Sequence, residues 1–300
     1  MPAPRRVIGI DLGGTGSRFV LMGEDGKVLK NLTVKTPTFS NKDLSIQFIM
    51  EAINSVANGT EIFGVGIGAT GPIDPDGIIQ NPDTLAAFSG FNLVDTLANE
   101  LSLPVYIEND AVSAALAEYQ FGSTRKSSSL LLITLGTGIG TSLLINGEPF
   151  RGGDGWHPEG GHLDVGRLNE GCYCGRTSCW ESSASRQALQ RIAAEKINFP
   201  VTSIADLDEI VARTFTQDPV AIEIFKEYGI RVAEGLANLC GLYRPTDIVF
   251  SGGGARYFAQ FSPAMLNYLE KVQNWIPKVI IQASILGDFA GAMGAATLAL

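Results

Sequence analysis

Short apolar runs that end in glycine-rich turns alternate along this chain with segments whose apolar residues have helical spacing. The first run, residues 7–11, leads through a glycine turn at 12–16 into an alternating strand at 17–22. The dipeptide Asp25-Gly26 is typical of a hairpin tip, and a third predicted strand, residues 28–36, follows it. Buried strands joined by tight turns, together with helices, predict an α/β protein.

The same two patterns continue to the end of the chain. Helical spacing predicts helices at residues 43–58, 111–121, 185–197, 204–214, 219–242, 263–275 and 290–300. Short apolar runs predict further strands at residues 63–68, 105–108, 129–134, 141–145, 247–250 and 279–283. Ser262 is expected to cap the helix that Pro263 opens, because proline is favoured at the first helical position.

The opening pattern occurs twice. A strand at 129–134, a glycine turn at 135–140 and a return strand at 141–145 end in Asn146-Gly147, a strong hairpin signal. Repetition at a spacing of about 120 residues indicates two similar domains. We expect a small α/β domain, residues 1–120, and a large α/β domain, residues 121–300.

Composition agrees with a two-domain globular protein. The chain has 300 residues, of which 45% are hydrophobic and 18% charged, and more than one core is usual at this length. Its net charge of -9 argues against a nucleic-acid surface, which needs a basic face. No apolar run reaches membrane-spanning length, and no signal peptide is visible at the N-terminus. We therefore expect a cytoplasmic protein without nucleic-acid or membrane partners.

The two repeated glycine turns are candidate phosphate sites. Gly13-Gly14-Thr15 and Thr137-Gly138 stand at equivalent places, and a third glycine cluster occupies residues 252–254. Glycine lets a backbone approach a phosphate closely because it has no side chain. In so acidic a chain, a phosphate must rely on backbone N–H groups and a metal cation. Neither turn is a Walker A loop or a Rossmann fingerprint.

One segment, residues 159–181, holds three of the four cysteines and one of the two histidines. His162, Cys172, Cys174 and Cys179 form a soft ligand set that suits a tetrahedral structural zinc ion. The alternative is four unrelated buried residues. Glu159 and Glu181 bracket the cluster, so a bound metal would fix both carboxylates in place.

Asp110 stands where the strand at 105–108 gives way to the helix at 111–121. A lone aspartate at such a place is by default an N-cap. The alternative is a carboxylate that faces a substrate.

Several motifs together resemble one family. They are Asp11-Leu-Gly-Gly-Thr, Gly66-x-Gly-x-x-Gly-Pro-Ile-Asp74, Glu108-Asn-Asp-Ala, Gly136-Thr-Gly-Ile-Gly, Glu159-Gly-Gly-His, Cys172-x-Cys-Gly-x3-Cys-x-Glu181, Ser251-Gly-Gly-Gly and Gly291-Ala-Met-Gly-Ala-Ala. In this order they resemble the ROK family of bacterial sugar kinases and sugar-responsive repressors, over essentially the whole chain. The resemblance implies an actin-like/hexokinase-type ATPase fold, with a sugar and ATP-Mg2+ in a cleft between two domains. It also implies a terminal helix, about residues 289–300, that packs back on the first domain.

The resemblance further implies the role of each matched residue. Asp110 would be the catalytic base, and His162 would bind sugar as well as zinc. Sugar contacts are implied for Gly71, Asn81, Asn109, Asp110, Glu159, His162 and Glu181. Contacts with ATP or Mg2+ are implied for Asp11, Gly13, Gly14, Thr15, Thr137, Gly138, Gly253 and Gly254. Asp11, at the end of the first strand, is the expected organiser of Mg2+ or its waters.

The sequence departs from the family pattern at several places. Thr70 stands where the family commonly has proline, and Ser178 replaces a common glycine. Bulky residues, 156–158, precede the Glu-Gly-Gly-His motif, and the loops at 81–84 and 89–91 match only roughly. These departures affect the substrate more than the fold or the zinc ligands. We interpret His157 as a supporting or surface residue.

The expected function is an ATP-dependent kinase for a hexose hydroxyl, with the 6-hydroxyl of glucose as first choice. N-acetylmannosamine, N-acetylglucosamine, fructose and allose kinases share these motifs and remain alternatives, as does polyphosphate in place of ATP. A transcription regulator would carry a helix-turn-helix before the first strand, where only six residues precede Val7. A zinc-stabilised binding protein without activity is a third possibility. The family also implies a homodimer.

Overall fold

We describe the protein from a computed structural model, in which residues 5–38, 41–124, 126–167, 171–272 and 278–300 are described. The chain divides into two compact units. Unit 1 comprises residues 1–132, 142–158 and 285–300, and unit 2 comprises residues 133–141 and 159–284. The predicted helix end at 273–275 and part of the predicted zinc segment, 168–170, lie outside the described residues.

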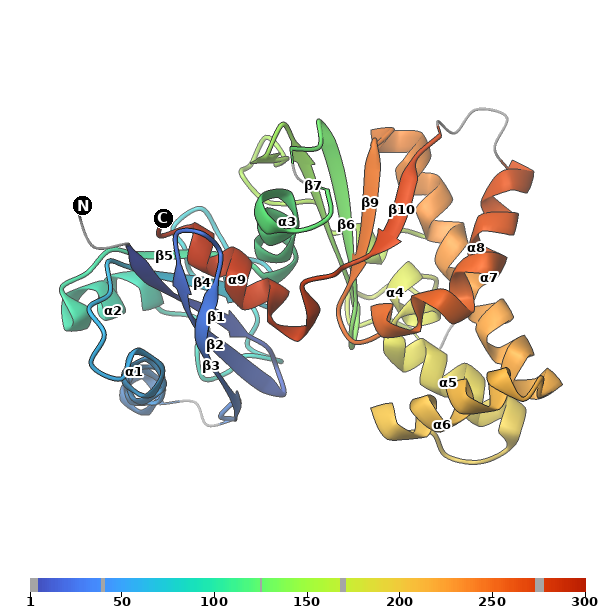
Figure 1. Ribbon diagram of the computed structural model, residues 1–300, viewed down its shortest axis with the longest axis horizontal. Helices are drawn as coiled ribbons and strands as arrows, with labels where there is room; N and C mark the ends of the chain where they lie inside the picture. The colour runs from blue at the N-terminus through green and yellow to red at the C-terminus, as the bar shows by residue number, and fades with distance from the viewer. Residues whose placement is uncertain (1–4, 39–40, 125, 168–170, 273–277) are drawn as a thin grey trace. The chain divides into compact units, whose positions relative to one another are not determined.

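Unit 1 contains a mixed five-stranded sheet with the order β3-β2-β1-β4-β5 (Figure 1). Its strands are β1 (Arg6–Leu12), β2 (Gly16–Gly23), β3 (Val28–Lys35), β4 (Val65–Ala69) and β5 (Val105–Asn109). β1, β2 and β3 pair antiparallel, whereas β4 runs parallel to both β1 and β5. Because β1, β4 and β5 are parallel, the loops that follow them all begin at the same end of the sheet, where these strands terminate.

The helices of unit 1 are α1 (Lys42–Ala57), α2 (Leu93–Leu101), α3 (Asp110–Phe121) and α9 (Ala290–Thr297). α2 was not predicted from the sequence, because it is short and buries only Leu93 and Leu97. α1 and α2 share one apolar core with the sheet, whose largest members include Phe19 and Phe88.

α9 packs directly on β1, β4 and α3, and Figure 1 shows it crossing the strands of this sheet. Glycines make the close approach possible. A Cβ atom on Gly9 would lie 1.9 Å from the carbonyl oxygen of Ala292, and one on Gly66 would lie 1.7 Å from that of Ala295. Most of the buried residues of the helix are small, such as Gly294, and Met293 is the large exception.

A second five-stranded sheet has the order β10-β9-β6-β7-β8. Its strands are β6 (Ser129–Leu135), β7 (Ile139–Ile145), β8 (Glu148–Pro149), β9 (Asp247–Ser251) and β10 (Ile280–Ala283). At the tip between β7 and β8, Asn146 has φ 52° and Gly147 has φ 89°. Positive φ at both central positions is the type I′ geometry, so the hairpin predicted from Asn146-Gly147 is confirmed.

Apart from its parts of this sheet, unit 2 is mainly helical. Its helices are α4 (Trp180–Ala184), α5 (Arg186–Ile197), α6 (Ile204–Phe215), α7 (Pro219–Tyr243) and α8 (Phe258–Val272). Short 3-10 turns lie at Gly160–His162 and Ala255–Tyr257, and a further one in unit 1 at Gly287–Phe289. α7 and α8 pack side by side, with the ring of Tyr228 edge-on to that of Phe261 at 5.3 Å between centroids.

The predicted start of the helix at Pro263 is wrong. α8 begins at Phe258, so Pro263 lies inside the helix and Ser262 is a buried helical residue rather than a cap. Phe258 and Phe261 each pack 5.8 Å from Phe250 of β9. This aromatic packing holds the first turn in helical form even though the proline cannot donate a backbone hydrogen bond.

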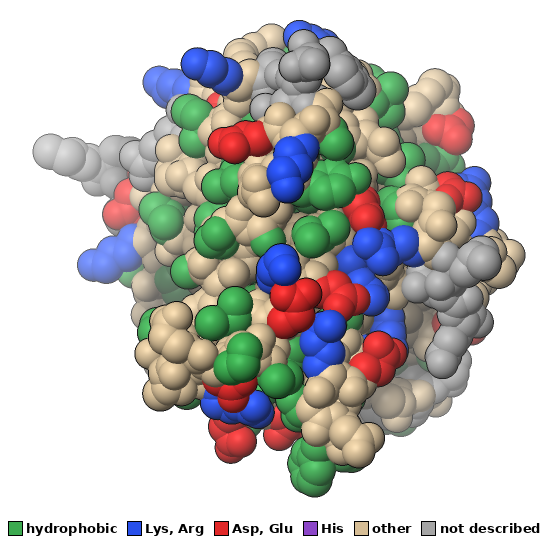
Figure 2. Space-filling view, turned by 90° about the vertical axis from the view of Figure 1, so that its right-hand side faces the viewer, with side chains coloured by type: hydrophobic (Ala, Val, Ile, Leu, Met, Phe, Trp, Pro, Cys, Tyr) green, Lys and Arg blue, Asp and Glu red, His purple; other side chains and the backbone are tan. Residues whose placement is uncertain are grey.

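The face in Figure 2 mixes acidic, basic and apolar side chains without sorting them by kind. Within the described residues, no helix combines the length and the apolar character needed to cross a bilayer.

Candidate active site

Asp110 is the first residue of α3, directly after β5. The N-cap is Asn109, whose side-chain oxygen accepts hydrogen bonds from the backbone N–H groups of Ala111 (2.8 Å) and Val112 (3.2 Å). The default interpretation of Asp110 as the cap is therefore wrong. Asn109 is the cap, and Oδ1 of Asp110 shares the N–H of Ala111 with it at 2.8 Å.

Thr70 holds one oxygen of this carboxylate. Its hydroxyl donates to Oδ2 of Asp110 at 2.8 Å. The backbone of Thr70 is fixed on both sides: its N–H donates to the carbonyl of Leu12 (3.1 Å), and its carbonyl accepts from Nδ2 of Asn81 (2.9 Å). Through these hydrogen bonds Thr70, the residue after β4, connects the end of β1 with the start of α3.

The next residue, Gly71, completes this cluster. Its φ of 96° lies in a region that favours glycine, and a Cβ atom there would lie 2.5 Å from Nδ2 of Asn81. Its carbonyl accepts from Nδ2 of Asn109 at 3.1 Å. Four residues predicted to bind sugar, Gly71, Asn81, Asn109 and Asp110, are therefore brought together within unit 1.

Glu108, which precedes them on β5, is buried and forms an ion pair with Arg151. Its other carboxylate oxygen accepts from the backbone N–H of Asn109 at 2.8 Å. Arg151 also donates to the carbonyl of Gly155 (3.2 Å), so it ties the loop after β8 to the end of β5. Arg151 could not be predicted from the sequence, because nothing in a lone arginine signals a partner 43 residues away.

Asp11 lies at the end of β1, and its pKa is raised from 3.8 to about 7. Burial is the main cause, and the negative charge of Asp110 adds to it. Arg18, whose Nη1 lies 3.4 Å from Oδ2, opposes the shift. A buried carboxyl group beside a second carboxylate forms an environment that favours a cation.

The glycine turn after β1 is closely packed. Thr36 donates to the carbonyl of Gly13 at 2.5 Å, and a Cβ atom on Gly14 would lie 2.3 Å from the methyl carbon of Thr84. Thr15 is exposed. The loop that contains Asn81 therefore lies against the first predicted phosphate turn.

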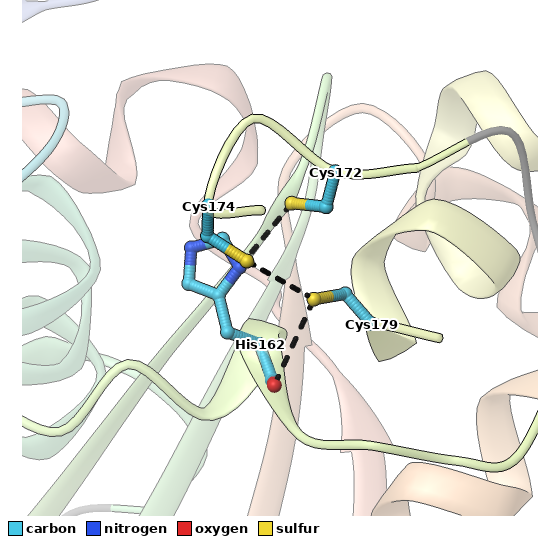
Figure 3. Close-up of side chains that lie close together, drawn as sticks. All are labelled: His162, Cys172, Cys174 and Cys179. Carbon is cyan, nitrogen blue, oxygen red and sulfur yellow. Dashed lines mark hydrogen bonds between the residues drawn. The ribbon is translucent and has the colours of Figure 1, made fainter. Parts of the chain in front are cut away.

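In unit 2, the predicted metal ligands converge (Figure 3). Ligand atoms of His162, Cys172, Cys174 and Cys179 all lie within 4.8 Å of one another. Sγ of Cys172 lies 3.5 Å from Nδ1 of His162, and Sγ of Cys174 lies 3.4 Å from Sγ of Cys179. Tetrahedral zinc with its usual bond lengths needs ligand atoms about 3.5–3.8 Å apart. The residues thus fit a zinc ion in chemistry, and the two distances given lie close to this spacing.

Glu181, the first-turn acidic residue of α4, links this cluster to the second glycine turn. Oε1 accepts from the thiol of Cys172 (3.1 Å) and lies 3.5 Å from Nδ1 of His162. Oε2 accepts from the backbone N–H of Ile139 at 3.4 Å, and a Cβ atom on Gly138 would meet it at 2.3 Å. A side chain at position 138 would displace this carboxylate.

Glu159 is exposed and precedes the 3-10 turn that carries His162. The turn is anchored where the backbone N–H of Gly160 donates to Thr141 at 3.0 Å. His162 directs its second ring nitrogen, Nε2, to the hydroxyl of Tyr173 at 2.9 Å. Tyr173 was missed in the sequence, although its place between two predicted ligands, Cys172 and Cys174, was an available signal.

The other glycine turns of unit 2 are bonded to one another. The backbone N–H of Gly254 donates to the carbonyl of Leu135 at 2.7 Å, and that of Arg186 donates to the carbonyl of Gly136 at 3.0 Å. The Arg186 side chain lies against Gly253, with Cδ 3.3 Å from the position of a Cβ atom. Thr137 is exposed at the tip. Thr137, Gly138, Gly253 and Gly254 therefore belong to one neighbourhood, with Arg186 as an unpredicted cationic member.

Comparison with known proteins decides the family. A sequence model described as "ROK family" matches residues 7–300. The chain belongs to the ROK family. A ROK relative, the glucokinase of Thermotoga maritima, is 30% identical over 308 residues, which cover 98% of this chain and 96% of the relative. The xylose repressor of Caldicellulosiruptor bescii is 27% identical over 303 residues, covering 94% and 72%.

Among solved ROK structures, the glucokinase of Streptomyces griseus, in complex with glucose and AMPPNP, has a TM-score of 0.85. It is 29% identical, with 98% of each chain covered. The two mixed sheets flanked by helices match ROK glucokinases of the actin-like ATPase fold, so the predicted fold class is confirmed.

Proposed function

We propose that this ROK family protein is an ATP-dependent sugar kinase that phosphorylates a hexose hydroxyl, with the 6-hydroxyl of glucose as the expected acceptor. The observation that carries the proposal is the position of the Asp110 carboxylate. It follows the helix cap Asn109 at the end of β5 and accepts a hydrogen bond from Thr70, which follows β4. The similarity to glucokinases, including one solved with glucose and AMPPNP, supports the same activity.

In the proposed reaction, Asp110 accepts the proton of the sugar hydroxyl while the hydroxyl oxygen attacks the γ-phosphorus of ATP. A bond forms between that oxygen and phosphorus, and the bond from phosphorus to the β–γ bridging oxygen breaks. The products are a sugar phosphate and ADP. Such a transfer depends on in-line positioning and charge stabilisation rather than on a covalent intermediate with the protein.

We assign sugar binding to polar groups that suit hydroxyls. The set is Gly71, Asn81, Asn109, Asp110, Glu159, His162 and Glu181. Each buried polar group that a wrong sugar leaves unpaired costs about 1–3 kcal/mol, which is enough to distinguish epimers. We assign the phosphates of ATP to the turns at Gly13-Gly14-Thr15 and Thr137-Gly138, and the adenosine to Gly253 and Gly254. Backbone N–H groups of such turns can bind phosphate without a positively charged side chain.

Two metal ions belong to the proposal. Mg2+, organised by Asp11, would supply positive charge to the phosphates of ATP. Zn2+, held by His162, Cys172, Cys174 and Cys179, would be structural. The chain's own contribution is to fix Nδ1 of His162 toward the three thiols and to leave Nε2 facing Tyr173.

The deciding experiment replaces the proposed base. Asp110→Asn keeps the shape of the side chain, and we expect turnover to fall about 100- to 10,000-fold, as is typical when a general base is lost. Asp43→Asn is the matched control, because Asp43 is an exposed acidic residue in the first turn of α1. Near-normal turnover in Asp110→Asn would show that the base is assigned wrongly.

Identifying the sugar that accepts the phosphoryl group, and the compound that donates it, requires a panel of substrates. ADP release should be measured with glucose, N-acetylmannosamine, N-acetylglucosamine, fructose and allose, and sugar phosphate formation with polyphosphate in place of ATP. We expect the highest kcat/KM for glucose with ATP.

The xylose repressor relative favours a second candidate, a sugar-responsive regulator. That function requires sugar binding, measurable by calorimetry, without phosphorylation of any sugar on the panel. A homodimer, expected from the family, can be tested by light scattering after size exclusion.

A further inference from the structure

We propose that Thr70 is a positioning residue for Asp110, and that its hydroxyl holds the carboxylate in the orientation needed to accept the proton of the sugar. The proposal rests on the function proposed above, in which Asp110 is the base.

The two oxygens of Asp110 have different donors. Oδ1 accepts from the backbone N–H of Ala111 at 2.8 Å, while Oδ2 accepts from the hydroxyl of Thr70 at 2.8 Å. An aspartate side chain turns about two bonds, so a single donor would leave the carboxylate plane free to rotate. Two donors on different elements fix that plane. A carboxylate offers about four lone-pair sites, so one that accepts these hydrogen bonds can also accept a substrate proton.

The backbone and the side chain of Thr70 are both restricted, so its hydroxyl can hold the Asp110 carboxylate in one orientation. Its backbone N–H and carbonyl are bonded to Leu12 and Asn81, at 3.1 and 2.9 Å. Threonine is branched at Cβ, so its hydroxyl has few positions once the backbone is fixed. Leu12 ends β1 and directly follows Asp11. The orientation of the base is thereby coupled to the strand that carries the expected Mg2+ organiser.

The hydroxyl of Thr70 acts through Asp110 and not through the sugar. Its loss should therefore lower the fraction of bound substrate that is aligned for reaction while leaving the binding of the sugar nearly unchanged. This separates a positioning role from a binding role, since a binding residue would change KM first. It also separates positioning from a purely structural role, which would lower the amount of folded protein and not the turnover of what is folded.

Two substitutions at position 70 test this. Thr70→Val keeps the branched shape and the backbone N–H but removes the hydroxyl, whereas Thr70→Ser keeps the hydroxyl. We expect Thr70→Val to lower kcat about 10-fold with sugar KM within about twofold, because small misalignment of reacting groups is costly. Thr70→Ser should restore kcat to within about threefold of the parent. Thermal midpoints of both variants report whether they are folded.

A double variant connects the effect to the base. When Asp110→Asn has already removed the proton acceptor, adding Thr70→Val should lower kcat no further. An equal loss in both backgrounds, an unchanged kcat in Thr70→Val, or equal impairment of Thr70→Val and Thr70→Ser in folded protein would overturn the proposal. If Asp110→Asn alone retains normal turnover, the proposed base itself fails, and that result is separate from the other three.

Discussion

The hydroxyl of Tyr173 lies 2.9 Å from Nε2 of His162, and the two rings meet edge to face at 5.1 Å between centroids. Tyr173 is otherwise 84% exposed, although burial of its hydroxyl and the nearby carboxylates of Glu181 and Glu159 raise its pKa. Because Nδ1 faces the thiols, Nε2 is the nitrogen that remains for a sugar hydroxyl. Tyr173 therefore occupies the hydrogen-bonding position that we assign to the substrate.

We predict that Tyr173→Phe lowers the KM for sugar about two- to fivefold, because the sugar no longer competes with the phenol for Nε2 and a net hydrogen bond is worth about 1 kcal/mol. Steady-state kinetics at saturating ATP will measure the change. Tyr106→Phe, on an exposed tyrosine of β5, is the control and should change nothing. A higher KM in Tyr173→Phe would instead mean that the phenol itself contacts the sugar.

The cysteine cluster predicts the metal content of the protein. Elemental analysis should find about one zinc ion per chain, as one cluster of four N and S ligands implies. Cys174→Ser should lose the zinc and lower the thermal midpoint, because metal-binding free energy contributes to folding. Cys240→Ala is the control, since Cys240 is buried in α7 away from the four ligands and should keep the metal. Purified parent protein without metal would contradict the assignment.

The ligand set and the glycine turns could be predicted because their signals are local. His162 and the three cysteines lie within one segment, and their spacing alone suggests zinc. Asn146-Gly147 sets the hairpin by its own backbone preferences. In each case the chemistry that decides the structure is contained in a few consecutive residues.

What could not be predicted depends on residues distant in sequence. Thr70 and Asp110 are 40 positions apart, and nothing in either residue identifies the other as its partner. Asn109, and not Asp110, caps α3, because the side chain of Asn109 accepts hydrogen bonds from two backbone N–H groups of the first turn. Pro263 fails as a helix start because aromatic packing from β9 holds the preceding turn. Tertiary contacts override local preferences in all three cases.

The raised pKa of Asp11 predicts how stability changes with pH. The unfolded chain releases this proton near pH 3.8, whereas the folded chain keeps it until about pH 7. Between these values the folded state binds more protons, so the contribution of Asp11 to the free energy of unfolding falls as pH rises and is fully lost above about pH 7. Asp11→Asn cannot ionise and should avoid this loss.

We therefore expect Asp11→Asn to have a higher thermal midpoint than the parent at pH 8, with the difference shrinking toward pH 4. The measurement is thermal unfolding across this range without Mg2+ or nucleotide, so that no ligand compensates the charge. Asp43→Asn, on an exposed carboxylate, should follow the parent at every pH. A difference that grows toward low pH would contradict the direction of the pKa shift.

The contact between β4 and α9 gives the last prediction. Gly66 belongs to a Gly-x-Gly-x-x-Gly stretch. Helix packing requires glycine at this position, because a Cβ atom would lie 1.7 Å from the carbonyl oxygen of Ala295. Because that oxygen is backbone, no side-chain rotation can relieve the clash, and the helix would have to move away from the sheet. We expect Gly66→Ala to destabilise unit 1 by about 2–4 kcal/mol, the upper range of overpacking effects, measured by the urea midpoint. Gly153→Ala is the control, because open space surrounds Gly153. An unchanged midpoint in Gly66→Ala would show that α9 does not pack on β4 as closely as described.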